Sequence, residues 1–160
     1  MNVLKKLKSE IEVCDLHASR LSVALRHIEP LFPLTLEKLE VLKDEEIGFL
    51  ELMSSRFAKL QDTIGRKIFP LLLMTLDEYE ESNSFIDRLN KLEKLEILKD
   101  LSLWNRMRKV RNEIAHDYPG DSDQKALKIK HCFESSHSLL SFWEDLKKIM
   151  IQRTLVNNNN

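Results

Sequence analysis

Glycine and proline are scarce in this sequence, which limits the folds that it can form. Its 160 residues include three glycines and four prolines, too few for the frequent tight turns of a β-rich domain. Apolar residues make up 42% and charged residues 32% of the chain, a balance typical of a globular protein rather than of a disordered one. The composition therefore favours a single helical domain with an apolar core.

Cysteines and long apolar runs are also few. Cys14 and Cys132 are too few for a disulfide framework and indicate reduced thiols, as found inside cells. The longest apolar run, Ile68–Met74, contains Pro70 and is far shorter than a membrane span. The charged start of the chain is not followed by the apolar stretch of a signal peptide. We therefore expect a cytoplasmic protein that has no membrane partner.

Neither sign of charge is in clear excess. The net charge is −1, which excludes a surface that attracts polyanions over its whole extent. A site for nucleic acid would have to come from a local cluster of basic residues.

Apolar residues recur at the three- and four-residue spacing of helices through most of the chain. The spacing predicts helices over 3–28, from 36 into the seventies with a break near Asp44, over 85–98, over 102–117 and over 122–155. No segment alternates apolar and polar residues for long enough to predict a strand. We expect an all-α, up-and-down bundle of about five helices, formed by one domain over residues 1–156 and followed by a disordered tail at 157–160.

Proline and cap residues mark the expected helix boundaries. Pro30 and Pro33 stop the first helix, and Thr35 and Ser84 can cap the helices that follow them. Pro70 is expected to kink the second helical region without ending it, because apolar residues continue beyond it.

Two long helical regions carry most of the expected core. The second region has one apolar stripe, formed by Phe49, Met53, Phe57, Leu60, Ile64 and Ile68. The last helix is expected to bury Leu127, Ile129, Cys132, Phe133, Leu139, Phe142, Trp143, Leu146 and Ile149. Arg56 and Asp62 are interpreted as part of a solvated face on which Asp62 pairs with Arg66, with a supporting role in a site as the alternative.

The stretch RNEIAHDYP, Arg111 to Pro119, places a titratable cluster in an apolar seam. At helical spacing the seam consists of Trp104, Met107, Arg111, Ile114 and Tyr118. A guanidinium rarely lies in such a seam unless it is paired, or faces a shared cavity or a partner. The cluster is therefore either the end of a helix or a site.

Helical geometry separates the two residues of this cluster that suit catalysis best. His116 follows Arg111 by five residues, a rotation of about 140° on an ideal helix, whereas Asn112 and His116 share a face. One chain therefore does not easily bring Arg111 and His116 to one atom. Two copies of the helix around a two-fold axis would bring both pairs into one groove, so we expect a site composed by a homodimer.

Basic residues precede this cluster. Arg106, Arg108, Lys109 and Arg111 supply four cations in six positions with no acid among them. Beside a histidine, such cations suit a phosphodiester, and Arg106, Arg108 and Lys109 form our candidate RNA-phosphate patch, called the basic patch below. Cations and a following proline also suit the C-terminal end of a helix, so both interpretations stay open on the pattern alone.

The motif Arg111-Asn112-x3-His116-x-Tyr118 resembles the R-x4-H-x-Y motif of the HEPN superfamily. It is most similar to that of the HepT-like toxins, which are encoded beside minimal nucleotidyltransferases of the MntA type. Trp104, Met107 and the polar residue directly after the arginine also match this pattern.

Two upstream segments extend the resemblance. RFAKLQDTIGRKIFPLLL (Arg56–Leu73) and SFIDRLNKLEKL (Ser84–Leu95) resemble segments of one HepT-like branch. The resemblance covers roughly residues 45–150, and the joint occurrence of three segments is more specific than the short motif.

The resemblance implies a helical bundle that dimerises through the motif helices and cleaves RNA without a metal ion or another cofactor. It implies Arg111 and His116 as the catalytic pair and Asn112 as the residue that supports them. In the MntA-paired subgroup the antitoxin attaches AMP to the tyrosine of the motif, which is Tyr118 here. The implied partners are a second copy of the chain, single-stranded RNA and an MntA-like nucleotidyltransferase.

These residue types suit attack of a ribose 2′-hydroxyl on the adjacent phosphate. Histidine suits proton transfer because its ordinary pKa of about 6.5 lies near working pH. The planar guanidinium of arginine donates two hydrogen bonds to phosphate oxygens and keeps its charge. AMP on Tyr118 would place bulk and negative charge where the phosphate should lie, and would compete for Arg111.

Two further functions stay open beside an active ribonuclease toxin. One is a non-catalytic HEPN-type subunit that binds RNA, a nucleotide or the substrate of a partner nucleotidyltransferase, and the other is a purely structural helical dimer. Cys14 and His17 have ligand spacing but no second pair accompanies them, so no metal site is expected. The sequence lacks a glycine-rich phosphate loop and a nucleotidyltransferase motif, so another chain would have to add AMP.

Overall fold

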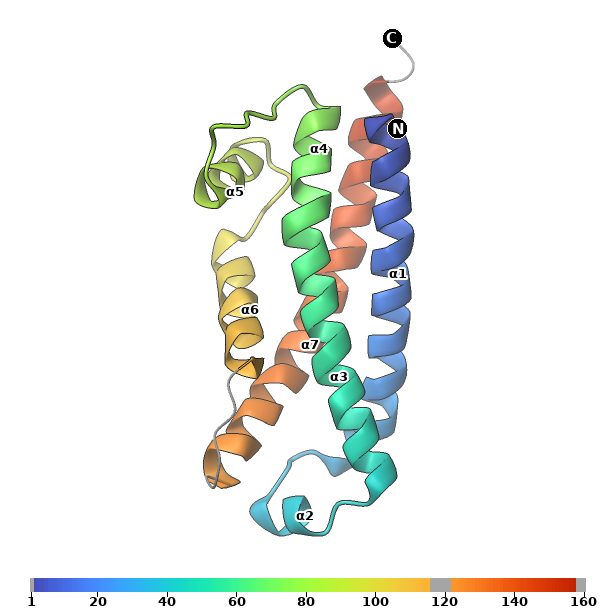
Figure 1. The fold of residues 1–160 in the computed structure, drawn as a ribbon, viewed down its shortest axis with the longest axis vertical. Coiled ribbons are helices and arrows are strands. Elements are labelled where there is room, and N and C mark those ends of the chain that lie inside the picture. The colour runs from blue at the N-terminus through green and yellow to red at the C-terminus, as the bar shows by residue number, and fades with distance from the viewer. Residues whose placement is uncertain (1, 116–121, 158–160) are drawn as a thin grey trace.

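The computed structural model describes residues 2–115 and 122–157, and for residues 155–157 the backbone alone. Within these ranges every regular element is helical, which confirms the all-α prediction (Figure 1). In chain order the elements are α1 (Val3–Ile28), η1 (Glu29–Leu31), α2 (Leu36–Glu40), α3 (Asp44–Thr63), η2 (Ile64–Ile68), α4 (Phe69–Thr75), α5 (Phe85–Lys94), α6 (Leu101–Ile114) and α7 (Ser122–Asn157). The number exceeds the expected five because the second helical region is divided into several elements.

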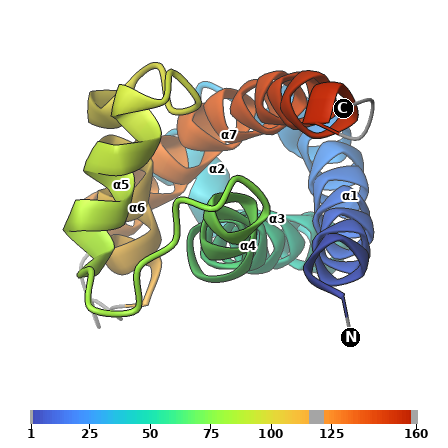
Figure 2. The ribbon, with the colours of Figure 1, turned by 90° about the horizontal axis from the view of Figure 1, so that it is seen from above.

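The long helices form a bundle with two shorter helices at its side. Figure 1 shows α1 beside the continuous rod of α3, η2 and α4, with α7 slanting from beneath α6 to the side of α1. Seen from above, α5 and α6 lie together on the flank of this bundle (Figure 2). We call the rod Asp44–Thr75 the long helix. The chain direction of α6 is opposite to that of the long helix, so the two lie antiparallel (Figure 1).

The expected helix boundaries are largely confirmed. α1 ends at Ile28, two residues before Pro30, and a short 3-10 turn follows it. The hydroxyl of Thr35 accepts a hydrogen bond from the Lys38 N–H at the start of α2. Ser84 and Asp87 form a reciprocal capping box at the start of α5.

α5 is shorter than expected, because a Schellman turn ends it at Lys94 rather than Leu98. Glu96 takes the left-handed conformation with φ 58°, its N–H bonds to the Glu93 carbonyl, and the Ile97 N–H bonds to the Leu92 carbonyl. Ile97 and Leu98 are buried all the same. The apolar spacing therefore continues past the end of the helix, and the predicted helix end at 98 is wrong.

Pro70 leaves the long helix unbroken, as expected, because a wider turn precedes it. Proline has no N–H to donate, and its ring would meet the carbonyl four residues earlier in a regular α-helix. Here the turn Ile64–Ile68 is π-helical, and the Phe69 N–H bonds to the Ile64 carbonyl five residues back. α4 then continues to Thr75.

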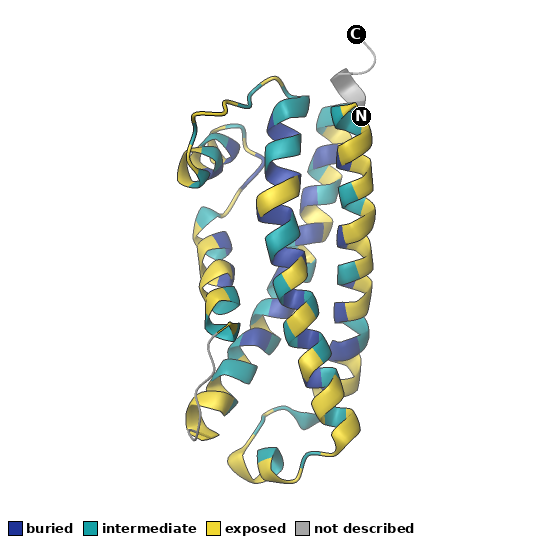
Figure 3. Ribbon diagram, in the orientation of Figure 1, coloured by how far each residue is buried: buried dark blue, intermediate teal, exposed yellow. Residues whose placement is uncertain are grey.

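The core is formed by the inner sides of the long helices (Figure 3). The expected stripe of the long helix is buried from Met53 to Ile68, with Phe49 half-buried at its start. One expected core residue of α7 is wrong: Leu127 is 44% exposed, because it lies in the first turns of α7, beyond the packed part of the bundle. Although α1 and α7 have the length of a membrane span, no helix in the described ranges is also apolar enough to be one.

Gly65 permits the closest approach between the long helix and α6. A Cβ atom built at Gly65 would lie 3.1 Å from Cζ2 of Trp104, and 3.6 Å from the ring of Phe85. The Trp104 indole is fully buried and also contacts Phe69 and Phe142, with ring centroids 4.8 and 5.4 Å away. The absence of a side chain at position 65 therefore sets how deeply α6 packs.

Alanine at the two helical glycines should have opposite effects on stability. Gly48→Ala places a methyl group where no atom lies within 4 Å, so helix propensity should raise the free energy of unfolding by about 0.5–1 kcal/mol. Gly65→Ala must displace the Trp104 ring, so we expect a net loss of about 1 kcal/mol. Urea denaturation followed by circular dichroism measures both. Equal stabilisation by both substitutions would contradict the close packing at Gly65.

Candidate functional site

The motif residues that the structure describes lie in the last turn of α6. Arg111 is half-buried and Asn112 is exposed, while His116 and Tyr118 lie outside the described residues. α6 ends at Ile114 with Ala115 as its C-cap, rather than near Asp117 as expected. The angle between Arg111 and His116 involves a residue outside the described ranges, so the composite site and the homodimer stay predictions.

Arg111 is paired across the bundle with Asp62 of the long helix. Its Nε donates to Oδ1 and its Nη2 donates to Oδ2, each over 2.9 Å, which is the bidentate geometry of a guanidinium with a carboxylate. The two side chains are 26% and 31% exposed. These hydrogen bonds raise the pKa of the Arg111 guanidinium above its ordinary value. The expected i,i+4 pairing of Asp62 with Arg66 is wrong, because Asp62 turns toward α6 instead.

This pairing uses one edge of the Arg111 guanidinium and leaves the other edge free of Asp62. The carboxylate takes the edge formed by Nε and Nη2. The end of the group, with one proton of Nη1 and the second proton of Nη2, is the edge that can donate two hydrogen bonds to a phosphate. Asp62 thus holds Arg111 in one orientation and leaves the donors of the other edge for hydrogen bonds to an anion.

Arg111 and Asn112 line a cavity of about 330 Å³ between the long helix, α5 and α6. We call it the α6 cavity. Its lining residues are Gln61, Asp62, Gly65, Arg66, Phe85, Trp104, Arg108, Arg111 and Asn112. These residues come from 56–73, from 84–95 and from the motif helix, which are the three segments quoted in the sequence analysis.

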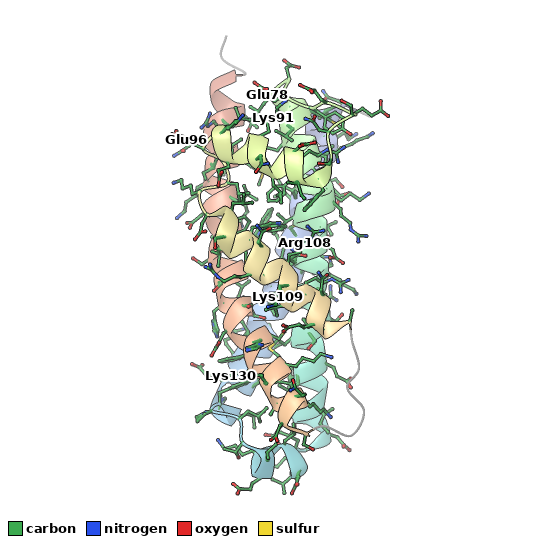
Figure 4. All side chains as sticks on the ribbon, turned by 90° about the vertical axis from the view of Figure 1, so that its left-hand side faces the viewer. Glu78, Lys91, Glu96, Arg108, Lys109 and Lys130 are labelled. Carbon is green, nitrogen blue, oxygen red and sulfur yellow. The ribbon has the colours of Figure 1, made fainter. Side chains whose placement is uncertain are left out.

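The basic patch is divided by the fold. Arg108 lines the α6 cavity, and its guanidinium carbon lies 4.6 Å from the centroid of the Phe85 ring. Arg106 instead donates to the hydroxyl of Ser102, 2.8 Å away, and neither it nor Lys109 lines the cavity. Figure 4 looks onto the side of the molecule on which α5 and α6 lie, and labels Arg108 and Lys109. Of the three expected phosphate contacts, Arg108 is the one that belongs to the cavity.

The sequence pattern did not identify several of the residues that line the α6 cavity. Gly65, Arg66 and Phe85 lie within the quoted segments, but no local pattern relates them to a motif that begins at Arg111. The one available signal was that three separated segments resembled the same family, which suggests that they meet in space.

The indole of Trp104 adds a buried N–H that has no acceptor among the described residues.

Other candidate side chains are accounted for by packing. Nη1 of Arg56 lies 2.9 Å from Nδ1 of His17, which joins α3 to α1, so Arg56 is not on a solvated face. Burial, together with Arg56 and Lys59, lowers the pKa of His17 and favours the neutral ring that accepts this bond. Burial raises the pKa of Cys14 to about 12 and that of Cys132 to about 11, so neither thiol is a ready nucleophile. Within the described ranges no three metal-ligating side chains gather.

Removal of the Asp62 carboxylate should destabilise the protein. Asp62→Ala leaves the half-buried Arg111 guanidinium without its partner, so we expect the free energy of unfolding to fall by about 1 kcal/mol. Glu51→Ala is the matched control, because Glu51 is an exposed carboxylate on the same helix, and should change stability by less than about 0.5 kcal/mol. Urea denaturation of the wild type and of the two variants measures the free energy of unfolding of each protein. Equal stability of the two variants would show that the ion pair contributes nothing to the fold.

Comparison of the chain with protein-family models, with curated proteins and with solved structures finds no match. The functional argument therefore rests on the motif, on the two segments that accompany it and on the geometry of the α6 cavity.

Proposed function

We propose that this protein is a metal-independent endoribonuclease of the HEPN type, which acts as a toxin and is neutralised by a nucleotidyltransferase partner. The observation that carries the proposal is the α6 cavity. Residues from all three family-like segments line it, and the motif arginine lies there with a phosphate-binding edge directed away from its carboxylate partner. If the three segments form one functional site, they are expected to meet at one cavity although they are far apart in sequence.

In the proposed reaction a ribose 2′-hydroxyl attacks the adjacent phosphate in line. Arg111 donates hydrogen bonds to the phosphate oxygens, where negative charge accumulates. His116 transfers the proton, and Asn112, exposed beside Arg111, supports the pair by hydrogen bonding. The products are a 2′,3′-cyclic phosphate and a free 5′-hydroxyl.

A homodimer through α6 would complete this site. Asn112 and Ala115 at the end of α6 are exposed, so this end is accessible to a second copy. A two-fold axis at this end would place the motif of each chain beside that of the other, as the resemblance implies.

The purified protein should cut single-stranded RNA in the presence of EDTA. His116→Ala should lower the cleavage rate by at least about 100-fold, because proton transfer by a positioned histidine contributes that much or more. Arg111→Lys should also lower the rate, since lysine keeps the charge but loses the bidentate geometry. Denaturing gels of a labelled RNA measure the rates, and the DNA of the same sequence should stay intact because it lacks the nucleophile.

His137→Ala is the control for the histidine substitution. His137 is exposed on α7 and does not line the α6 cavity, so this variant should cut RNA like the wild type. Undiminished cutting by His116→Ala would refute the catalytic assignment. Tight binding of RNA by a wild type that never cuts it would favour the non-catalytic subunit.

AMP transfer by a partner gives a second test, because the chain has two tyrosines. Coexpression with an MntA-like minimal nucleotidyltransferase should add the mass of AMP to the wild type and to Tyr79→Phe, but not to Tyr118→Phe. Tyr79 accepts a hydrogen bond from Arg88 over 3.1 Å and is a matched control within the fold. Intact-mass spectra measure the shift. A gain in Tyr118→Phe equal to that of the wild type would exclude Tyr118 as the acceptor.

A further inference from the structure

The charges around the α6 cavity are unequal. Three guanidinium groups and one carboxylate line it, and the carboxylate of Asp62 is already bound to Arg111. No second carboxylate from the described residues lines the cavity to balance Arg66 and Arg108. In a protein with a net charge of −1, these two groups create a local positive potential that favours an anion.

Two aromatic rings form the walls beside these cations. Phe85 lies under the Arg108 guanidinium, at 4.6 Å from its central carbon, and Trp104 closes the inner side. A guanidinium that lies on an aromatic ring offers its other face to a nucleobase. Trp104 also lines this cavity, and its buried N–H has no acceptor among the described residues. Buried donors without acceptors occur where a ligand or ordered water completes the bonding.

The π-helical turn of the long helix is what places Arg66 at this cavity. Gly65 and Arg66 both belong to this turn, and both line the cavity. π-turns inside α-helices occur frequently at functional sites, because the extra residue changes the direction of the side chains that follow. The next residue, Lys67, is exposed and does not line the cavity.

We propose that the α6 cavity is a nucleotide subsite in which Arg66 and Arg108 hold the phosphate next to the one that is cleaved. Its volume of about 330 Å³ is at the lower end of the range for small-molecule sites, which suits one nucleotide rather than a longer piece of RNA. The identification of the ligand as an RNA strand rests on the proposed function. The subsite positions the strand so that the following phosphate meets the edge of Arg111 that Asp62 does not bind.

Binding of an RNA strand that cannot be cut separates this subsite from catalysis. The probe is a fluorescein-labelled, single-stranded 2′-O-methyl oligonucleotide, which lacks the attacking hydroxyl, and fluorescence anisotropy of the full chain measures its Kd. Arg66→Ala and Arg108→Ala should each raise the Kd about tenfold, and should each reduce the slope of log Kd against log salt by about 1. Both arginines are exposed, so circular dichroism and the urea midpoint should stay at the wild-type values.

Two cations outside the cavity serve as matched controls. Lys67→Ala removes a charge from the same π-turn, and Arg20→Ala removes an exposed arginine from α1. Neither residue lines the cavity. Each should change the Kd less than about threefold. Equal effects of the cavity variants and the controls would overturn the subsite, and so would failure of the wild type to bind the probe.

The outcome for the subsite does not depend on the outcome for cleavage. If Arg66→Ala and Arg108→Ala weaken binding selectively while the wild type leaves RNA intact, the subsite stands and the proposed ribonuclease activity fails. If the wild type cuts RNA in EDTA and the cavity variants bind like the controls, the activity stands and the subsite is refuted.

Discussion

The packing of the Trp104 indole against Gly65 determines where α6 lies on the long helix, and the candidate site depends on that position. The indole is fully buried, and a Cβ atom at residue 65 would lie 3.1 Å from it. α6 and the long helix are antiparallel, so residues that follow Trp104 on α6 lie beside residues that precede Gly65 on the long helix. Arg111 follows Trp104 by seven residues, which is about two turns. Arg111 therefore meets Asp62, three residues before Gly65, and the bidentate ion pair forms.

The protein is nearly neutral overall, but the α6 cavity beside the ion pair has more positive than negative side chains along its walls. Asp62 neutralises the half-buried Arg111, while the exposed Arg66 and Arg108 line the cavity without a carboxylate partner among the described residues. A guanidinium fixed by one carboxylate loses little conformational entropy when it then binds a second anion. The proposed binding of RNA uses this division of roles: one arginine is held in place and two attract the strand.

Local chemistry made much of the fold predictable. The caps at Thr35 and Ser84 and the end of α1 before Pro30 involve residues close together in sequence, so they could be recognised directly. The end of α5 could not, because its Schellman turn places Glu96 in a left-handed conformation that glycine more commonly adopts. Leu127 was misjudged because helical periodicity identifies the apolar face of α7 but not how far the neighbouring helices extend along it.

The sequence by itself determined the helical class, most helix boundaries, the core stripe of the long helix and the presence of a charged motif in an apolar seam. These features depend on residues within a few turns of one another, where spacing translates directly into position. Only the tertiary structure decided which acid pairs with Arg111, that Arg108 rather than Arg106 or Lys109 lines the cavity, and that Arg66 and Phe85 join it. Asp62 and Arg111 are 49 residues apart, and their meeting depends on how closely two helices pack at a glycine, which no local pattern encodes.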